Sequence, residues 1–115
     1  MPDERFRPAD RIRHSREFEA IYARGTRLHA RYFMLLILPN TLGHSRLGIT
    51  LSRKTGPAVK RNRTRRRLRE IFRRNPPMRQ AGIDLVIHGK PGIAAIDSRE
   101  MEVELGRCLS RYRSR

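Results

Sequence analysis

The sequence predicts a single α+β domain whose elements follow the order α-β-β(-β)-α-β-α. Apolar residues recur at helical spacing in three segments, and runs of strand-forming residues separate these segments. A chain of 115 residues can bury one modest core but not two independent ones. Residues 1–14 mix proline and charge without periodicity. We therefore predict a flexible basic lead-in at 1–14 and one domain over 15–115.

The first helix is predicted over residues 15–24. Ser15 can cap its start, because a hydroxyl oxygen accepts a hydrogen bond from a free backbone N–H of the first turn. Phe18, Ile21 and Tyr22 follow one another at i, i+3 and i+4, so they share one face.

The strands are predicted in three places. Residues 27–38 are rich in strand formers and end at a Pro-Asn pair. Residues 45–53 alternate between apolar and polar side chains, which predicts a strand with one packed face. The short segment 40–45 between them suits a hairpin. Residues 83–88 form a short apolar run that predicts a further strand.

Two more helices are predicted in the second half. Pro57 suits the first turn of a helix that continues to about residue 74 and ends at Asn75-Pro76-Pro77. Asp97 and Glu100 are spaced as a capping box for the last helix. An amphipathic stripe follows that box, made of Met101, Leu105, Cys108, Leu109 and Tyr112.

The charge of the chain indicates a polyanionic partner. Lys and Arg number 27 against 11 Asp and Glu, a formal net charge of +16. Such a charge destabilises a compact state by self-repulsion. We expect nucleic acid and no membrane, because no apolar run is long enough to span a bilayer. The single cysteine excludes a disulfide framework and favours a reducing, cytoplasmic location.

The helix over 57–74 carries most of this charge on one side. At 100° per residue, Thr64, Ile71 and Phe72 lie within about 60° of Leu68. These residues are predicted to anchor the helix. The outer side carries two ridges: Asn62, Arg66, Arg69 and Arg73 on one, and Arg63, Arg67 and Arg74 on the other. We expect this side to bind phosphates, and the amide of Asn62 to read a 2′-hydroxyl, a base edge or a metal-bound water.

No catalytic residue and no metal ligand is predicted in the chain. The four histidines lack metal-ligand spacing, and Cys108 lies on an apolar stripe. Neither a pair of carboxylates nor a Ser/His/Asp set is legible. The chain therefore offers no recognisable set of groups for acid–base or metal-assisted chemistry.

The stretch "TGPAVKRNRTRRRLREIFR" resembles the RNR motif of the bacterial ribonuclease P protein subunit. The matching positions are Ala58, Val59, Arg61, Asn62, Arg63, Arg65, Arg66, Arg69 and Glu70. "RIRHSREFEAIYARGTRLHARYFMLLILPN" and "RLGITLSRKTG" are similar to the family's first helix and strands, so the resemblance covers roughly residues 11–110. The sequence departs from the family pattern at two positions. Pro57 stands where many members have Asn and still suits a helix start, and Arg65 stands where Lys is common and keeps the positive charge.

The resemblance implies a fold and a function. The fold is an α-β sandwich on a mixed sheet, with a left-handed crossover around the basic helix. The function is that of the protein subunit of a ribonucleoprotein endoribonuclease, which removes the 5′ leader from precursor tRNA. Its partners are the catalytic RNA and the leader, with no obligate protein partner evident. Mg²⁺ would be held mainly by the RNA.

The resemblance also assigns residues to two surfaces. The expected contacts of the basic helix with RNA are Lys60, Arg61, Asn62, Arg63, Arg65, Arg66, Arg69 and Arg73. The expected cleft for the single-stranded leader contains Phe18, Tyr22, Ser52, Arg53 and Lys54. Aromatic rings beside basic groups suit unpaired RNA, because every base offers a face for stacking. A role of Phe18 and Tyr22 in core packing stays open beside this one.

Two alternatives stay open at this stage. A structural rRNA-binding protein without a role in cleavage would have the same composition. A DNA-binding regulator is disfavoured, because no partner helix with a short turn precedes the basic helix.

Overall fold

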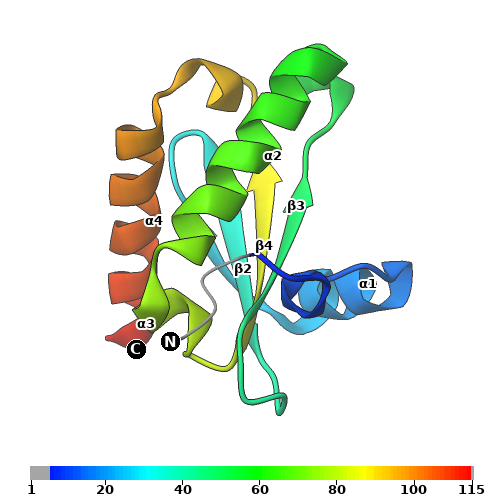
Figure 1. The fold of residues 1–115 in the computed structure, drawn as a ribbon, viewed down its shortest axis with the longest axis vertical. Coiled ribbons are helices and arrows are strands. Elements are labelled where there is room, and N and C mark those ends of the chain that lie inside the picture. Colours follow the sequence, from blue (N-terminus) through cyan, green and yellow to red (C-terminus); the bar gives the residue numbers. More distant parts are fainter. Residues whose placement is uncertain (1–5, 115) are drawn as a thin grey trace.

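The computed structural model describes residues 6–114 and contains one four-stranded sheet, in the order β1-β2-β4-β3 (Figure 1). The strands are β1 (Thr26–His29), β2 (Phe33–Pro39), β3 (Arg46–Thr50) and β4 (Ile83–Gly89). β2 is antiparallel to both β1 and β4, whereas β3 and β4 are parallel, so the sheet is mixed. The helices are α1 (Ser15–Arg24), α2 (Ala58–Arg73), the short α3 (Pro76–Arg79) and α4 (Ser98–Arg113).

Helices cover both faces of the sheet. On one face, Leu35 and Ile37 of β2 share a core with residues of α2 and α4, such as Leu68 and Leu105. On the other face, Leu36 packs in a second core below α1. Alternate residues of β2 therefore enter different cores, which explains why its sequence is apolar throughout and does not alternate.

The connection from β3 to β4 passes through α2 and is left-handed. In Figure 1 both strands run upward, α2 descends in front of the sheet, and β4 lies to the left of β3. Almost all crossovers between parallel strands have the opposite hand. The predicted fold class, including this crossover, is confirmed.

The predicted hairpin between residues 27–38 and 45–53 is wrong. β4 lies between β2 and β3 and pairs with both. β4 is buried from Ile83 to Ile87, and a strand with apolar groups on both faces gains most from a central place. The run 27–38 also divides into two strands, because the chain turns back where the Ala30 N–H donates to the Phe33 carbonyl at 2.9 Å.

The helix ends differ in detail from the predictions. The N-cap of α1 is His14, and Ser15 is already helical. The segment expected to stop α2 forms the short α3, whose start is capped by Asn75 Oδ1 accepting from the Met78 N–H at 3.1 Å. The cap of α4 is confirmed, since Asp97 Oδ1 accepts from the Glu100 N–H at 2.8 Å.

The lead-in is described from residue 6 onward, and residues 1–5 of the predicted flexible segment lie outside the described part. Ile12 is buried, and its N–H donates to the Leu47 carbonyl of β3 at 3.1 Å. Phe6 meets Phe72 of α2 edge-on, with ring centroids 5.7 Å apart. The flexibility of 1–14 stays a prediction. None of the helices within residues 6–114 is long and apolar enough to cross a membrane.

Candidate nucleic-acid interface

α2 is fixed to the domain through the side that its sequence predicts. Thr64, Leu68, Ile71 and Phe72 are its buried residues, the same four that the helical wheel places together. The Thr64 hydroxyl donates to the Lys60 carbonyl at 3.0 Å, so the one polar member of this set is satisfied. The charged residues are consequently turned away from the core.

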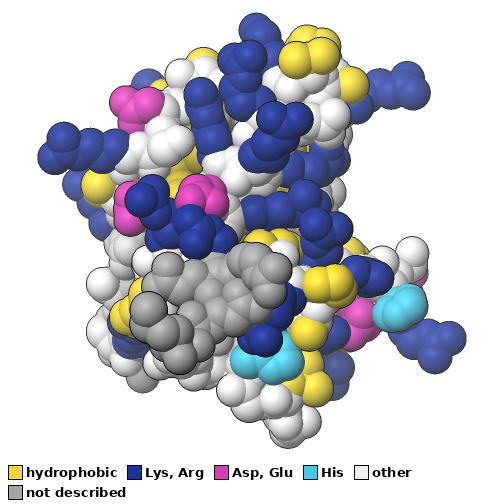
Figure 2. Space-filling model, in the orientation of Figure 1, with side chains coloured by type: hydrophobic (Ala, Val, Ile, Leu, Met, Phe, Trp, Pro, Cys, Tyr) yellow, Lys and Arg dark blue, Asp and Glu magenta, His cyan; other side chains and the backbone are white. Residues whose placement is uncertain are grey.

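The outer side of α2 is cationic and open to solvent. Figure 2 shows Lys and Arg side chains gathered over the part of the surface where α2 lies in Figure 1. Four of the predicted RNA contacts are exposed, namely Lys60, Asn62, Arg63 and Arg66. The other four, Arg61, Arg65, Arg69 and Arg73, are half-buried.

Some of these arginines also stabilise the protein itself. Arg61 donates to the Gly56 carbonyl at 2.9 Å, and Arg67 donates to the Ile96 carbonyl at 3.2 Å. Arg73 binds Glu70, and this ion pair lowers the pKa of the Glu70 carboxyl. Arg63 and Arg66 are exposed and have no hydrogen bond or ion pair with any residue of the described range, so their guanidinium groups are free to bind a partner.

Asn62 lies among these cations with one half of its amide engaged. Its Oδ1 accepts from the Arg65 guanidinium at 3.2 Å. The Nδ2 group makes no hydrogen bond within residues 6–114 and is exposed. It therefore presents a directional, uncharged donor in the middle of a charged surface.

Of the residues predicted for the leader cleft, Phe18 and Tyr22 lie on α1, on the opposite face of the sheet. Phe18 and Tyr22 are both half-buried and pack around the core of that face. The close approach of α1 depends on Gly48, because a Cβ atom at this position would lie 2.8 Å from the Phe18 ring. Core packing of both aromatic residues is thus established, and each still keeps an exposed part.

Tyr22 is held by a residue that the sequence did not single out. Its hydroxyl lies 2.7 Å from Nδ1 of His88 on β4, and the two rings meet edge-on with centroids 5.8 Å apart. We assign Nδ1 as the acceptor, because a phenol is a better donor than acceptor, and this assignment places the ring proton on Nε2. The two residues are 66 positions apart, and no local pattern could have paired them.

His88 belongs to a row of side chains that crosses the sheet next to α1. Met34 lies beside it on β2, and Thr50 lies beside it on β3. All three are half-buried. Ser52, Arg53 and Lys54 follow directly after β3 and are exposed. The sheet therefore places His88 of β4 beside Tyr22. The basic residues Arg53 and Lys54 follow the end of the neighbouring strand β3.

The other end of α1 is fixed by an ion-pair network. Arg46 of β3 donates to Glu17 of α1 at 2.6 Å and to Asp84 of β4 at 2.7 and 3.0 Å. Asp84 also accepts from Asn40 Nδ2 at 2.8 Å. The hydrogen bond from Arg46 is the main reason that the pKa of Glu17 lies below its usual range. These carboxylates are structural, because their oxygens already have partners.

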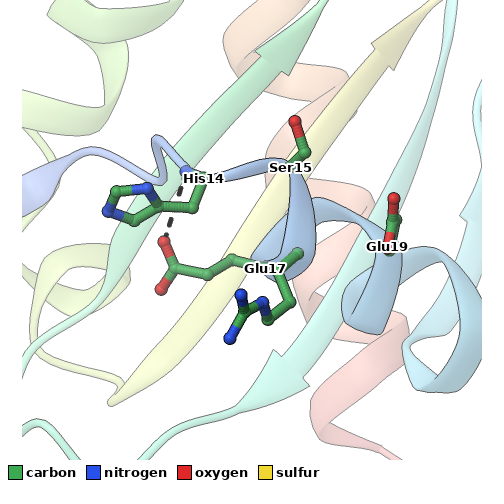
Figure 3. A pocket seen from close by; sticks show the side chains of 5 residues that line it. His14, Ser15, Glu17 and Glu19 are labelled. Atoms are coloured by element: carbon green, nitrogen blue, oxygen red, sulfur yellow. Dashed lines mark hydrogen bonds between the residues drawn. The ribbon is translucent and has the colours of Figure 1, made fainter.

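A surface pocket at the start of α1 is unsuited to a phosphate. It is lined by His14, Ser15, Arg16, Glu17 and Glu19 (Figure 3). The Glu17 carboxylate turns back to the His14 N–H, 3.4 Å away, and the second carboxylate adds negative charge. Among residues 6–114 there is also no group of three His, Cys, Asp or Glu side chains that could hold a metal ion.

Comparisons with known proteins agree with this architecture. The family model described as Ribonuclease P matches residues 6–113. The ribonuclease P protein component of Syntrophus aciditrophicus is 37% identical over 103 residues, which cover 90% of this chain and 87% of the relative. That of Citrifermentans bemidjiense is 34% identical over 115 residues, covering 100% of this chain and 98% of the relative.

Solved structures give the same result. The RNase P protein from Thermotoga maritima has a TM-score of 0.78 at 35% identity, covering 88% of this chain and 96% of that one. The Staphylococcus aureus RNase P protein has a TM-score of 0.78 at 26% identity, covering 90% of this chain and 94% of that one. The chain therefore belongs to the bacterial ribonuclease P protein family, the protein components of a ribonucleoprotein endoribonuclease that acts in tRNA processing.

Proposed function

We propose that this ribonuclease P protein works through two RNA-binding surfaces on opposite faces of its sheet. The first, the α2 surface, would bind the ribonuclease P RNA. It consists of Lys60, Arg61, Asn62, Arg63, Arg65, Arg66, Arg69 and Arg73. Support comes from the division of α2 into a buried apolar side and an outer cationic side. The buried side holds the helix in place, so its cations form a rigid surface that can bind the phosphates of a polyanion.

The second surface, the leader cleft, would bind the single-stranded 5′ leader of precursor tRNA. It consists of the predicted Phe18, Tyr22, Ser52, Arg53 and Lys54, together with Met34, Thr50 and His88. The exposed parts of the aromatic rings suit stacking with unpaired bases, and the nearby basic residues suit the phosphates between those bases. The Nε2–H of His88 adds a donor that faces solvent, since no buried side-chain nitrogen or oxygen of the described residues lacks a partner.

The bond-breaking chemistry, with its Mg²⁺ ions, is proposed to belong to the RNA. Mg²⁺ requires several oxygen ligands. The carboxylates near the two surfaces already bind arginines: Glu17 and Asp84 bind Arg46, and Glu70 binds Arg73. This donor set does not fit a resident Mg²⁺ site. We propose a cytoplasmic location on the basis of the single, buried Cys108, a free thiol.

The observation that carries this proposal is the two-sided α2, and cleavage of precursor tRNA tests it. The matching ribonuclease P RNA would be assayed at low Mg²⁺ with and without the protein. We expect the protein to restore specific cleavage that the RNA alone loses, because cations on α2 compensate for missing Mg²⁺. The protein without RNA should cleave nothing. Equal rates with and without the protein, or specific processing by RNA-free protein, would contradict the proposal.

A further inference from the structure

An aromatic residue of the lead-in holds two arginines from distant parts of the chain. The guanidinium carbon of Arg11 lies over the Phe6 ring, 5.5 Å from its centroid, and that of Arg69 lies 5.7 Å from the same centroid. The Phe6 ring in turn meets Phe72 edge-on, at an interplanar angle of 77°. Phe6 therefore connects the lead-in to α2 through a packing contact with Phe72 and a cation–π contact with Arg69, and it holds Arg11 of the lead-in through a second cation–π contact.

The backbone on each side of this contact is fixed. Arg11 forms a parallel bridge with Leu47 of β3, and the next residue, Ile12, is buried. Arg69 lies on α2, whose neighbouring residues Leu68 and Phe72 are almost fully buried. The two guanidinium groups are thus presented by well-anchored segments that are 58 residues apart in the sequence, since 69 − 11 = 58.

The electrostatics of this cluster are unbalanced. Burial lowers the pKa of Arg69, and the charges of Arg11 and Arg65 lower it further. Within the described part of the chain, no carboxylate forms an ion pair with any of these three arginines. Arg65 donates only to the neutral amide oxygen of Asn62. The charges repel one another, and a bound anion would remove that repulsion.

We propose that Arg11, Arg65 and Arg69 form a binding site for phosphates of the ribonuclease P RNA backbone, in which Phe6 is the positioning residue. Phosphodiester is the favoured ligand because guanidinium forks match phosphate oxygens in geometry and charge. The site extends the α2 surface onto the lead-in, where Phe6 and Arg11 lie outside the RNR motif. This proposal rests on the proposed binding of ribonuclease P RNA by the α2 surface. It does not depend on the leader cleft.

The first test measures binding of full-length Arg11→Ala to the ribonuclease P RNA, without tRNA, over a range of salt concentrations. We expect affinity to fall roughly tenfold and the slope of log K against log salt to decrease by about 0.7–0.9, the value for one lost phosphate contact. Arg99→Ala is the matched control, because Arg99 is exposed at the start of α4 and has no partner among the described residues. A parental slope for Arg11→Ala, or an equal change in Arg99→Ala, overturns the site.

The second test separates positioning by Phe6 from simple packing. Phe6→Leu keeps an apolar contact with Phe72 but removes the ring, so it should weaken RNA binding by roughly threefold to tenfold. Phe6→Tyr keeps the ring and should bind as the parent does. In the Arg11→Ala/Arg69→Ala background, Phe6→Leu should have no further effect on affinity, because the groups it positions are gone. An undiminished effect in that background, or parental binding by Phe6→Leu, overturns the positioning role.

Both tests measure RNA binding without tRNA, so their failure would not contradict the proposed leader cleft. Conversely, variants of the leader cleft that change recognition of precursor tRNA would not test the phosphate site.

Discussion

The two proposed RNA surfaces divide the work of packing and binding in different ways. On α2, packing and binding fall largely to different residues, since Leu68 is buried and Arg66 is exposed on the same helix. On α1, the same residues have both duties, since Phe18 and Tyr22 pack on the sheet and also offer ring surface to solvent. The difference follows from charge. A guanidinium cannot be buried without a partner, whereas an aromatic ring can be half-buried at little cost.

This difference between α1 and α2 determines which variants can separate stability from RNA binding. On α2, Leu68→Ala is expected to change stability, and Arg66→Ala is expected to change RNA affinity. Arg61 also binds the Gly56 carbonyl, so its substitution is expected to change both. A substitution on α1 is expected to change both, so a more conservative variant must accompany it.

The largest effect is expected for Leu68→Ala. Leu68 is 1% exposed, so its truncation should leave a cavity and reduce the free energy of unfolding by about 2–5 kcal/mol. Denaturant titration measures this loss. Val59→Ala is the matched control on the same helix, because Val59 is 71% exposed and its truncation should change stability by less than about 0.5 kcal/mol. Equal losses in the two variants would contradict the buried side assigned to α2.

Phe18→Ala and Tyr22→Ala should have the next largest effect, and they should change two quantities. We expect the holoenzyme to lose about 1–3 kcal/mol of binding to precursor tRNA for each lost ring, with a smaller loss for mature tRNA. The free energy of unfolding should fall as well, because both rings pack on the sheet.

Tyr22→Phe separates the two duties of Tyr22. It keeps the ring but loses the hydrogen bond to His88, so it should lose about 1 kcal/mol of stability and keep most of the preference for precursor tRNA. If all three variants weaken both tRNAs equally, these aromatic residues serve packing only.

A smaller effect is expected for Glu17→Gln, which tests how the start of α1 is fixed. The pKa of Glu17 lies below its usual range in the folded protein, mainly because of its hydrogen bond with Arg46. The stability from this group is therefore present above the unfolded pKa, about 4.3, and is lost as pH falls through the folded pKa. We expect Glu17→Gln to lower stability at neutral pH by less than about 1 kcal/mol, with little difference from the parent in strong acid. A constant difference across the acid range would show that the charge of Glu17 is irrelevant.

The sequence predicts those features of the fold that depend on local periodicity. The buried side of α2 is confirmed residue by residue, and the stripe of α4 is confirmed with Tyr112 half-buried at its end, because a helix of fixed pitch turns each position to a known angle. The position of β4 between β2 and β3 was not predictable in this way. Strand order depends on pairing between distant segments, and the residues from Asn40 to Ser45 carry no signal that excludes a hairpin.

The residues of the candidate site were likewise predictable only where a local sequence pattern identifies them. The cations of α2 were predictable because they are consecutive in the sequence. His88 was missed because its partner Tyr22 comes from another element, and the strand periodicity shows only that His88 faces away from Leu85 and Ile87. Phe6 was missed for the same reason, since its contacts with Arg11 and Arg69 join segments that only the folded chain brings together.

The division of α2 into an anchoring side and an RNA-binding side is tested most directly by the salt dependence of binding to the ribonuclease P RNA. We predict that Arg66→Ala lowers affinity and decreases the slope of log K against log salt by about 0.7–0.9, because one phosphate contact and its counterions are lost. Asn62→Ala should lower affinity with the slope unchanged, because it removes a hydrogen bond and no charge. The folded fraction of Leu68→Ala should keep the parental slope. A parental slope for Arg66→Ala together with an altered slope for Leu68→Ala would contradict the account, because the RNA would then lie against another face of the helix.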